Sequence, residues 1–456
     1  MNKKILVIDT SVIIQDPVGW LSAFQENDVV LHVGVLEELD NINKDRTPGR
    51  ETASWCAREA VRSLNEFIGC GNIAEGIKTV GGGSLRFYTN ENGWGRLPKG
   101  LTQSFDNLLL VTCLELQQKN PDTLVVLVTR DSILRMKALA LKIKAEDYRR
   151  DKVESVDRLY RGFAELTICP GALSALHRSR DGVISAEPEV CGVSREVVDS
   201  LQPNACCWLH ESVSNSHALA LYKKTQHVFK LVHKPKPSRT GEFSPKTDEQ
   251  ALGLALVADQ DLSLVSLIGR TGSGKTAMAL LEGYRSLKEG RYNQLVIIRP
   301  TEEVGETVGF LPGSLEEKMA PRLWPIVANL AMIAGGVKGP EVGRKEVESL
   351  IESGKIQISP TNFIRGGTYD RTFLLVDEAQ NLSRHSIKTT ITRAGERTVV
   401  RITGDLRQVD CKFMDSSSNG LAHVIDVFPG QAFYGHLMFR TSVRSSLAEI
   451  ADKLMV

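Results

Sequence analysis

The 456-residue sequence lacks any apolar run near the roughly 18 residues that a membrane-spanning helix requires. It also lacks a C-x-x-C pair among its 8 cysteines, which argues against a disulfide framework and a zinc site. Asp9 interrupts the apolar stretch at the N-terminus and no small-residue cleavage site follows, so we expect no signal peptide, no membrane partner and a cytoplasmic location. The net charge of +1 excludes a histone-like polycation but allows a local patch that binds nucleic acid.

The composition, with 42% apolar and 24% charged residues, is typical of a folded globular protein, and the length predicts about three domains. Residues 1–150 alternate short β-branched runs with helical stretches, which predicts an α/β fold with a parallel sheet. Residues 151–245 lack a helical period, so we expect a small β-rich domain that ends in a basic linker. Residues 246–456 return to the α/β pattern.

The strongest local signal is a complete G-x-x-x-x-G-K-[ST] motif between a predicted strand at Leu262–Ile268 and a predicted helix at Ala277–Leu287. Glycines let such a loop turn its backbone N–H groups toward phosphate oxygens, and the following helix adds partial positive charge. We expect Lys275 to reach the β and γ phosphates of ATP and Thr276 to bind Mg²⁺. The candidate ATP-binding residues are Gly269, Arg270, Thr271, Gly272, Ser273, Gly274, Lys275 and Thr276.

Two acidic residues follow the apolar strand predicted at Phe373–Val376. This is the Walker B pattern, in which Asp377 holds the Mg²⁺ and Glu378 polarises the attacking water. An apolar strand that ends in Asp-Glu is common by itself. Downstream of a complete phosphate loop, it predicts the second half of an ATP site.

Two glutamines are further candidates for the same site. Gln408 lies shortly after the strand predicted at Thr398–Ile402, where its amide could orient water or sense the γ phosphate. Gln250 lies just before the phosphate-loop strand and could hydrogen-bond the adenine edge. The other reading of Gln250 is a helix turn on the surface.

Residues 377–381 read Asp-Glu-Ala-Gln-Asn and residues 309–313 read Gly-Phe-Leu-Pro-Gly. With further motifs in the same order, they resemble the PhoH family of ATPases over about residues 246–450. That family resembles the first motor domain of superfamily 1 helicases, which implies a RecA-like fold. The further motifs are Arg299-Pro300, Glu317-Lys318-Met319, Ile364-Arg365-Gly366, Thr392-Arg393-Ala394-Gly395 and Ser418-Asn419-Gly420-Leu421.

A helicase of that superfamily closes its ATP between two motor domains, whereas residues 246–456 suffice for one. We therefore expect a neighbouring copy to complete the site, which predicts a homo-oligomer such as a ring. Arg393, Arg440 and Arg444 are candidates for an arginine finger, although each alone is better explained by a surface salt bridge.

Four carboxylates are expected to converge in the first domain. Asp9 ends the strand predicted at Lys4–Ile8, and Asp131 follows the strand predicted at Leu124–Val128. The carboxyl ends of parallel strands meet at one rim of a sheet. The other two candidates are Glu38, or its neighbour Glu37, at a helix start after Val29–Val35, and Asp106 at a helix start capped by Ser104.

Oxygen ligands of this kind suit Mg²⁺ or Mn²⁺, which can activate water for phosphodiester hydrolysis. The alternative is that each acid is only a strand-end or helix-start residue.

The stretches around these acids resemble the PIN nuclease family, small metal-dependent ribonucleases of Rossmann-like topology, over about residues 3–150. The resemblance implies that Asp9, Glu38, Asp106 and Asp131 are the metal carboxylates. It also implies a helper role for Thr10 or Ser11, which could equally cap the next helix. A PIN domain followed by a PhoH-like ATPase is a known arrangement, and it implies ATP-dependent RNA unwinding coupled to RNA cleavage.

The segment Lys223–Arg239 is basic without an acidic interruption and could follow an RNA backbone or form a solvated linker. Two other functions stay open. The chain could be an ATP-driven RNA-remodelling protein whose first domain is a non-cleaving docking module. It could also be a nucleotide switch without a nucleic-acid substrate.

Overall fold

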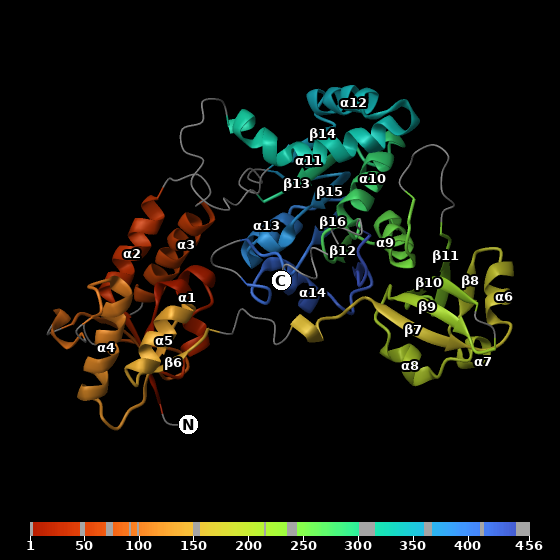
Figure 1. Cartoon of the computed structure of the whole chain (residues 1–456). Coiled ribbons are helices and arrows are strands. Elements are labelled where there is room, and N and C mark those ends of the chain that lie inside the picture. The colour runs from red at the N-terminus through yellow and green to blue at the C-terminus, as the bar shows by residue number, and fades with distance from the viewer. Residues whose placement is uncertain are drawn as a thin grey trace. The chain divides into compact units, whose positions relative to one another are not determined.

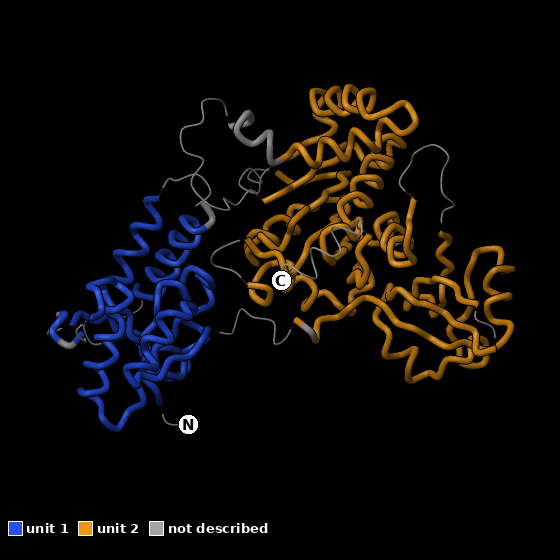
Figure 2. Tube along the Cα trace, in the orientation of Figure 1, with its two compact units in different colours: residues 1–152 blue, residues 153–456 orange. Residues whose placement is uncertain are grey.

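The computed structural model describes residues 3–45, 51–69, 76–90, 93–97, 100–148, 156–213, 216–234, 244–300, 315–359, 367–410 and 415–443. The chain divides into two compact units, residues 1–152 and 153–456 (Figure 2). Within the described ranges, no helix is long and apolar enough to cross a membrane. Several predicted features lie outside the described residues, namely the motifs at 309–313 and 364–366, Arg444, and the end of the basic segment at Arg239.

The first unit is built on a six-stranded sheet in the order β3-β4-β2-β1-β5-β6. This unit is the red to orange part of the chain in Figure 1. All neighbouring strands are parallel except β3 and β4, which confirms the predicted α/β class. Two interior strands, β1 and β5, are buried along their whole length, as expected for a parallel sheet covered by helices. The strands are β1 (Ile5–Ile8), β2 (Asp28–His32), β3 (Ile77–Lys78), β4 (Ser84–Tyr88), β5 (Val125–Val128) and β6 (Lys144–Glu146).

Among the residues described in the first unit, five α-helices and two short 3-10 turns accompany the sheet. Helices α1, α2 and α3 pack on one another, while α4 packs on β1 and β5. Helix α4 begins next to Asp106 as predicted, and Ser104 caps it by accepting a hydrogen bond from the Asn107 N–H (3.4 Å). The helices are α1 (Thr10–Gln15), α2 (Val33–Lys44), α3 (Glu51–Ile68), α4 (Phe105–Lys119) and α5 (Ser132–Ala140), and the turns are η1 (Leu21–Phe24) and η2 (Gly93–Arg96).

The strand predicted at Val29–Val35 ends earlier than expected. Helix α2 already begins at Val33, because His32 Nδ1 accepts a hydrogen bond from the Gly34 N–H (2.9 Å) and so caps the helix. The placement of Glu38 at a helix start was therefore wrong, since it lies in the second turn of α2. Val33 and Val35, which are typical of a strand, lie in the first turn of the helix instead, and Val35 is buried there.

The second unit holds two sheets. The middle sheet has the order β7-β9-β10-β11-β8, with β7 and β9 parallel and the other pairs antiparallel. Its mixed strands agree with the predicted β-rich region, while its three short helices were not predicted. The elements are β7 (Phe163–Ile168), α6 (Ala172–Arg178), β8 (Val183–Ser185), α7 (Pro188–Cys191), α8 (Arg195–Ser200), β9 (Cys206–Glu211), β10 (His217–Lys223) and β11 (Val228–Val232), after the turn η3 (Val156–Arg158).

The other sheet is entirely parallel, in the order β14-β13-β15-β16-β12-β17. The boundary between a middle domain and an ATPase domain inside this unit stays a prediction. The strands are β12 (Leu264–Ile268), β13 (Gln294–Ile298), β14 (Ile356–Ser359), β15 (Thr372–Val376), β16 (Val399–Gly404) and β17 (Tyr434–Met438). The helices are α9 (Asp248–Ala258), α10 (Lys275–Lys288), α11 (Leu315–Gly335), α12 (Pro340–Glu352), α13 (Arg384–Ile391) and α14 (Gly420–Val427), with the turns η4 (Gly336–Lys338) and η6 (Ala379–Asn381).

A buried arginine of β16 fixes the end of helix α9. Arg401 is only 2% exposed, and burial lowers the pKa of its guanidinium to about 10. It donates hydrogen bonds to the carbonyl oxygens of Val257 (3.0 Å), Asp259 (3.0 Å) and Leu262 (2.8 Å). A cation at a helix C-terminus also interacts favourably with the helix dipole, so α9 has a fixed position on the sheet.

Candidate functional site

The predicted phosphate loop joins β12 to α10, as the motif requires. Gly272 and Gly274 have φ angles of 87° and 91°, which side-chain-bearing residues rarely adopt. Gly269 is needed for another reason, because a Cβ there would lie 2.8 Å from Phe439 Cβ. The glycines therefore allow both the turn and its close contact with the chain after β17.

Lys275 is the first residue of α10 and is 7% exposed. Its ammonium donates hydrogen bonds to the carbonyl oxygens of Gly269 (2.6 Å) and Arg270 (3.3 Å) in the loop itself. Ser273 Oγ is buried and has no hydrogen-bond partner among the described residues. The Lys275 ammonium and the unbonded Ser273 hydroxyl therefore lie in the loop where the sequence predicts that phosphate binds.

Asp377 follows β15 and is 1% exposed. Its Oδ1 accepts hydrogen bonds from Thr276 Oγ1 and Thr403 Oγ1, both at 2.7 Å. Its Oδ2 lies 3.4 Å from an Arg299 guanidinium nitrogen and makes no hydrogen bond among the described residues. A buried carboxylate with a free oxygen beside a threonine hydroxyl fits the ligands of Mg²⁺. Thr403 was not predicted, because only the pairing of β15 with β16 brings it close.

Glu378 begins the turn η6 in a left-handed conformation, with φ of 53°. Such backbone strain is often found at functional sites. Burial raises the pKa of the Glu378 carboxyl, and the charge of Asp377 adds to this effect. Gln380 donates to Glu378 Oε2 (2.6 Å) and to the Gln408 carbonyl (3.0 Å), and accepts from the Asp405 N–H (3.0 Å). Gln380, which the sequence offered only as part of a motif, therefore connects the two predicted catalytic loops.

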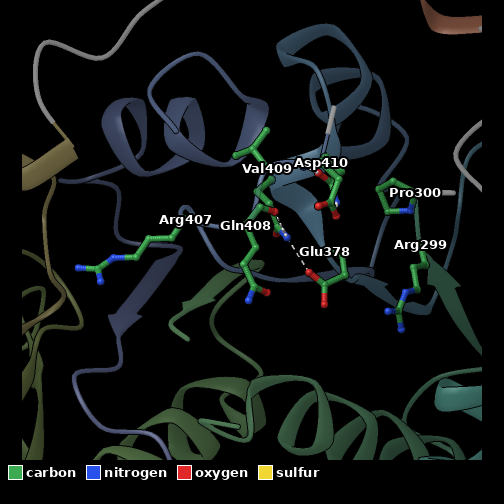
Figure 3. A pocket seen from close by; sticks show the side chains of 9 residues that line it. Arg299, Pro300, Glu378, Arg407, Gln408, Val409 and Asp410 are labelled. Atoms are coloured by element: carbon green, nitrogen blue, oxygen red, sulfur yellow. Dashed lines mark hydrogen bonds between the residues drawn. The ribbon is translucent and has the colours of Figure 1, made fainter. Parts of the chain in front are cut away.

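Glu378, Gln380 and Gln408 line a cavity of about 450 Å³. Figure 3 shows Glu378 and Gln408 on the same side of the cavity, with Arg407 pointing away from them. Gln408 Oε1 accepts a hydrogen bond from Thr271 Oγ1 (2.9 Å), which joins it to the phosphate loop. The lining residues are Arg299, Pro300, Glu378, Gln380, Asn381, Arg407, Gln408, Val409 and Asp410.

Gln250 is buried rather than on the surface, so the surface-turn reading was wrong. Its amide donates to the Ser273 carbonyl (3.0 Å) and accepts from the Lys246 N–H (2.7 Å). The structure thus gives Gln250 a contact with the phosphate loop, while adenine recognition by it stays a prediction.

The three arginine-finger candidates have different outcomes. Arg440 forms ion pairs with Glu249 (3.0 Å) and Glu165 (3.1 Å) of the same chain, which agrees with the salt-bridge reading. Arg393 follows α13, and Arg444 lies outside the described residues, so both stay predictions.

The acidic cluster of the first unit begins at the paired ends of β1 and β5. Asp9 is 5% exposed, and its Oδ2 accepts hydrogen bonds from Thr129 Oγ1 (2.6 Å) and from the Ser11 hydroxyl. Those two hydroxyls in turn accept from the backbone N–H groups of Asp131 (3.0 Å) and Arg130 (3.2 Å). The loop after β5 is therefore fixed to Asp9, and Thr129 is a contributor that the sequence did not single out.

The remaining carboxylates share the same electrostatic environment. Burial raises the pKa of Glu38, and the charges of Asp9 and Asp106 add to it. Burial likewise raises the pKa of Asp9, with Asp106 adding to it, and that of Asp106, with Asp131 adding to it. Thr10 Oγ1 donates to Glu38 Oε2 (2.6 Å). The four predicted acids are thus close enough to repel one another, which a bound cation would relieve.

The fit to a metal ion has a limit. In the ranges that the structure describes, no group of three or more His, Cys, Asp or Glu side chains is arranged closely enough to hold one. Asp131 Oδ1 also caps α5 by accepting hydrogen bonds from the N–H groups of Ile133 (2.7 Å) and Leu134 (3.2 Å). This agrees with the alternative that the acid is a helix-start residue. The oxygen donors and their charge suit Mg²⁺ or Mn²⁺, while their spacing requires side-chain adjustment.

Part of the basic segment belongs to strands β10 and β11 and not to a linker. Lys223 forms an ion pair with Asp259, and Lys234 forms one with Asp248 (3.2 Å). Lys224 donates to the carbonyl oxygen of Leu201 (2.9 Å). These lysines bind groups of the same chain, which weakens the argument that they follow an RNA backbone.

Comparison with known proteins identifies both predicted domains. The sequence model of the family described as "PIN domain" matches residues 6–149, and that described as "PhoH-like protein" matches residues 242–455. "Protein PhoH2" of Bacillus subtilis (strain 168) is 33% identical over 460 residues, which cover 99% of this chain and 100% of the relative. "Protein PhoH2" of Thermobispora bispora is 28% identical over 454 residues, with 98% and 96% covered. The chain therefore belongs to the PhoH2 family, in which a PIN nuclease domain is fused to a PhoH ATPase domain.

Proposed function

We propose that this protein hydrolyses ATP to unwind or translocate RNA and cleaves RNA with its metal-dependent PIN domain. The observation that carries the proposal is the convergence of Thr276, Asp377 and Gln408 at the phosphate loop. These residues come from three loops at the carboxyl ends of one parallel sheet, where α/β proteins bind ligands.

In the ATPase site, the backbone N–H groups of the loop and Lys275 would bind the phosphates. Thr276 and Asp377 would hold Mg²⁺, which when bound neutralises phosphate charge. Glu378 accepts a proton from the attacking water, and its raised pKa makes it a stronger base than an exposed glutamate. Gln408, in the loop after β16, orients that water.

In the PIN domain, Asp9, Glu38, Asp106 and Asp131 would hold Mg²⁺ or Mn²⁺. When bound there, such an ion would supply an activated water and would stabilise the leaving oxygen of the phosphodiester. The hydroxyls of Thr10, Ser11 and Thr129 fix the orientation of the two most buried carboxylates through the hydrogen bonds described above.

We further propose that the active form is a cytoplasmic homo-oligomer, such as a ring, in which a neighbour supplies an arginine to the ATP. One motor-sized sheet per chain supports this assembly. Sedimentation with a non-hydrolysable ATP analogue tests it, and a fully active monomer would refute it.

The ATPase proposal is tested by measuring phosphate release with and without single-stranded RNA, for the wild type and Lys275→Ala. We expect RNA to stimulate the wild type several-fold and Lys275→Ala to be inactive. Lys355, an exposed lysine directly before β14, provides the matched control Lys355→Ala, which should behave as the wild type. Turnover without any response to RNA would instead support a nucleotide switch.

A second function is favoured by one observation, namely that no group of three or more of these acids is arranged to hold an ion among the described residues. The PIN domain would then be a docking module of an ATP-driven RNA-remodelling protein. Binding of RNA without cleavage in both Mg²⁺ and Mn²⁺ would support this alternative.

A further inference from the structure

Arg440, just after β17, contacts the middle sheet and helix α9 at the same time. Its Nε lies 3.0 Å from Glu249 Oε1, and another guanidinium nitrogen lies 3.1 Å from Glu165 Oε1 on β7. The guanidinium also covers the rings of Phe163 (4.2 Å) and Trp208 (5.2 Å), on β7 and β9. One side chain therefore joins two strands of the middle sheet to the helix that precedes the phosphate loop.

Glu249 is the buried partner in this arrangement, with a side chain that is 6% exposed. Besides the Arg440 side chain, it accepts hydrogen bonds from the backbone N–H groups of Arg440 (3.2 Å) and Thr441 (3.0 Å). Thr441 Oγ1 adds another at 2.7 Å. A buried carboxylate with this many donors holds the start of α9 and the segment after β17 together.

Both of these segments reach the phosphate loop. Gln250, the residue after Glu249, donates to the Ser273 carbonyl at 3.0 Å. On the other side, the Val443 N–H donates to the Gly272 carbonyl at 3.1 Å. The loop carbonyls are thus held from two directions by segments that Glu249 connects.

Holding a carbonyl also orients the N–H of the same peptide group, because the peptide is planar and trans and the two groups point in opposite directions. The carbonyls of Gly272 and Ser273 share peptide groups with the N–H groups of Ser273 and Gly274. The Gly274 N–H is among the expected phosphate ligands of the loop, and the Ser273 N–H donates to the Arg270 carbonyl (3.2 Å), which closes the turn of the loop. Contacts made by Gln250 and Val443 therefore preset the phosphate-binding geometry.

We propose that Arg440 is a positioning residue for nucleotide binding, which acts through Glu249 on the peptide groups of the phosphate loop. Through Arg440, the middle sheet also helps to hold that loop in place. The inference rests on the proposed ATP-binding function. Arg440 itself does not touch the nucleotide. Because Arg401 holds the far end of α9 separately, loss of Arg440 loosens only the first turn of the helix and the adjacent loop.

The test compares Arg440→Gln, Arg440→Lys and Phe163→Leu with the wild type by the KM and kcat for ATP and by the Kd for a fluorescent ATP analogue. We expect Arg440→Gln to raise KM and Kd about tenfold while kcat changes less than about threefold. Arg440→Lys, which keeps the charge, should recover part of the affinity. Phe163→Leu, on the middle sheet, should raise KM about threefold.

Arg344→Gln is the matched control. Arg344 is also about half exposed, pairs with Glu348 (2.9 Å) and covers an aromatic ring, Trp324 (4.9 Å), but it lies on α12. Its KM should be that of the wild type. If the wild type turns over ATP and both Arg440→Gln and Phe163→Leu keep the wild-type KM, the inference is overturned.

Two other results are distinguishable. Absence of nucleotide binding by the wild type would refute the proposed function and not the role of Arg440 alone. If Arg440→Gln loses its cooperative thermal transition, Arg440→Lys and Phe163→Leu decide the question, and wild-type KM in both overturns the proposal.

Discussion

Thr276 donates a 2.7 Å hydrogen bond to Asp377, although 101 residues separate them in the sequence. The contact joins the phosphate loop to the end of β15. Thr403, on the neighbouring strand β16, donates to the same carboxylate oxygen, so two hydroxyls fix the acid that is expected to hold Mg²⁺. The orientation of a metal ligand by a neighbouring group commonly affects metal affinity by one to two orders of magnitude.

Replacing Thr403 with Val should therefore weaken Mg²⁺ binding without removing a direct ligand. We expect the Mg²⁺ concentration for half-maximal ATP turnover to rise about tenfold. The measurement is a Mg²⁺ titration of phosphate release at saturating ATP. Thr389→Val, which changes a half-buried threonine on α13, is the control, and an unchanged Mg²⁺ requirement in Thr403→Val would contradict this role.

The pH dependence of ATP turnover should reflect Glu378. Its pKa is raised by burial and by Asp377, and the base must be ionised, so activity should fall on acidification at a higher pH than for an ordinary glutamate. Gln380 stabilises the ionised form, so Gln380→Ala should move this acidic limb to still higher pH. The kcat profile between about pH 5 and pH 8 measures both. An acidic limb that moves downward in Gln380→Ala would show that the sign is wrong.

Asp9 should destabilise the folded PIN domain at neutral pH. A carboxyl with a raised folded-state pKa binds its proton more tightly when folded, so its favourable contribution is present at low pH and is lost as pH rises. Asp9→Asn should raise the Tm of this domain by about 2–4 °C at pH 7 and by less at low pH. Differential scanning calorimetry at the two pH values checks this.

The same experiment tests the metal site. Mn²⁺ should raise the Tm of the wild-type PIN transition, because ligand binding to the folded state stabilises it, and should have little effect on Asp9→Asn. Equal shifts in both proteins would argue against metal binding at the acidic cluster. Glu66→Gln, on the exposed face of α3, serves as the control carboxylate.

Arg401 should be important for stability because its guanidinium satisfies buried carbonyls at the end of α9. Arg401→Met should lower the free energy of unfolding of the second unit by about 3–5 kcal/mol, as for other buried charged groups that are removed from their partners. Urea unfolding measures this. Arg178→Met, at an exposed position of α6, should change it by less than about 0.5 kcal/mol.

Much of the fold could be predicted from local sequence. Strands β1 and β5 end where predicted and begin one residue later than predicted, because buried parallel strands read as continuous apolar runs. The start of α4 was predictable because Ser104 is a recognisable cap. Helix α2 was misread, because the valines at its start are equally typical of a strand and the cap is a histidine. The short helices α6 to α8 have too few residues to show a period.

The candidate site divides in the same way. Lys275, Thr276 and Asp377 were predictable because each belongs to a motif with a fixed place after a strand. Thr403 and Gln380 were not assigned roles, since their contacts depend on which strands are neighbours in the sheet. Glu249 and Arg440 are 191 residues apart, and no local pattern predicts such a pair.

The central claim is that the PIN domain cuts RNA, and a single cleavage assay tests it most directly. Labelled single-stranded RNA is incubated with the protein in Mg²⁺ or Mn²⁺, with and without ATP, beside Asp9→Asn, Lys275→Ala and Glu66→Gln. We expect cleavage by the wild type and Glu66→Gln, no cleavage by Asp9→Asn, and slow cleavage of unstructured RNA by Lys275→Ala. Intact RNA in both metals, while the wild type still hydrolyses ATP, would contradict it and make the PIN domain a docking module.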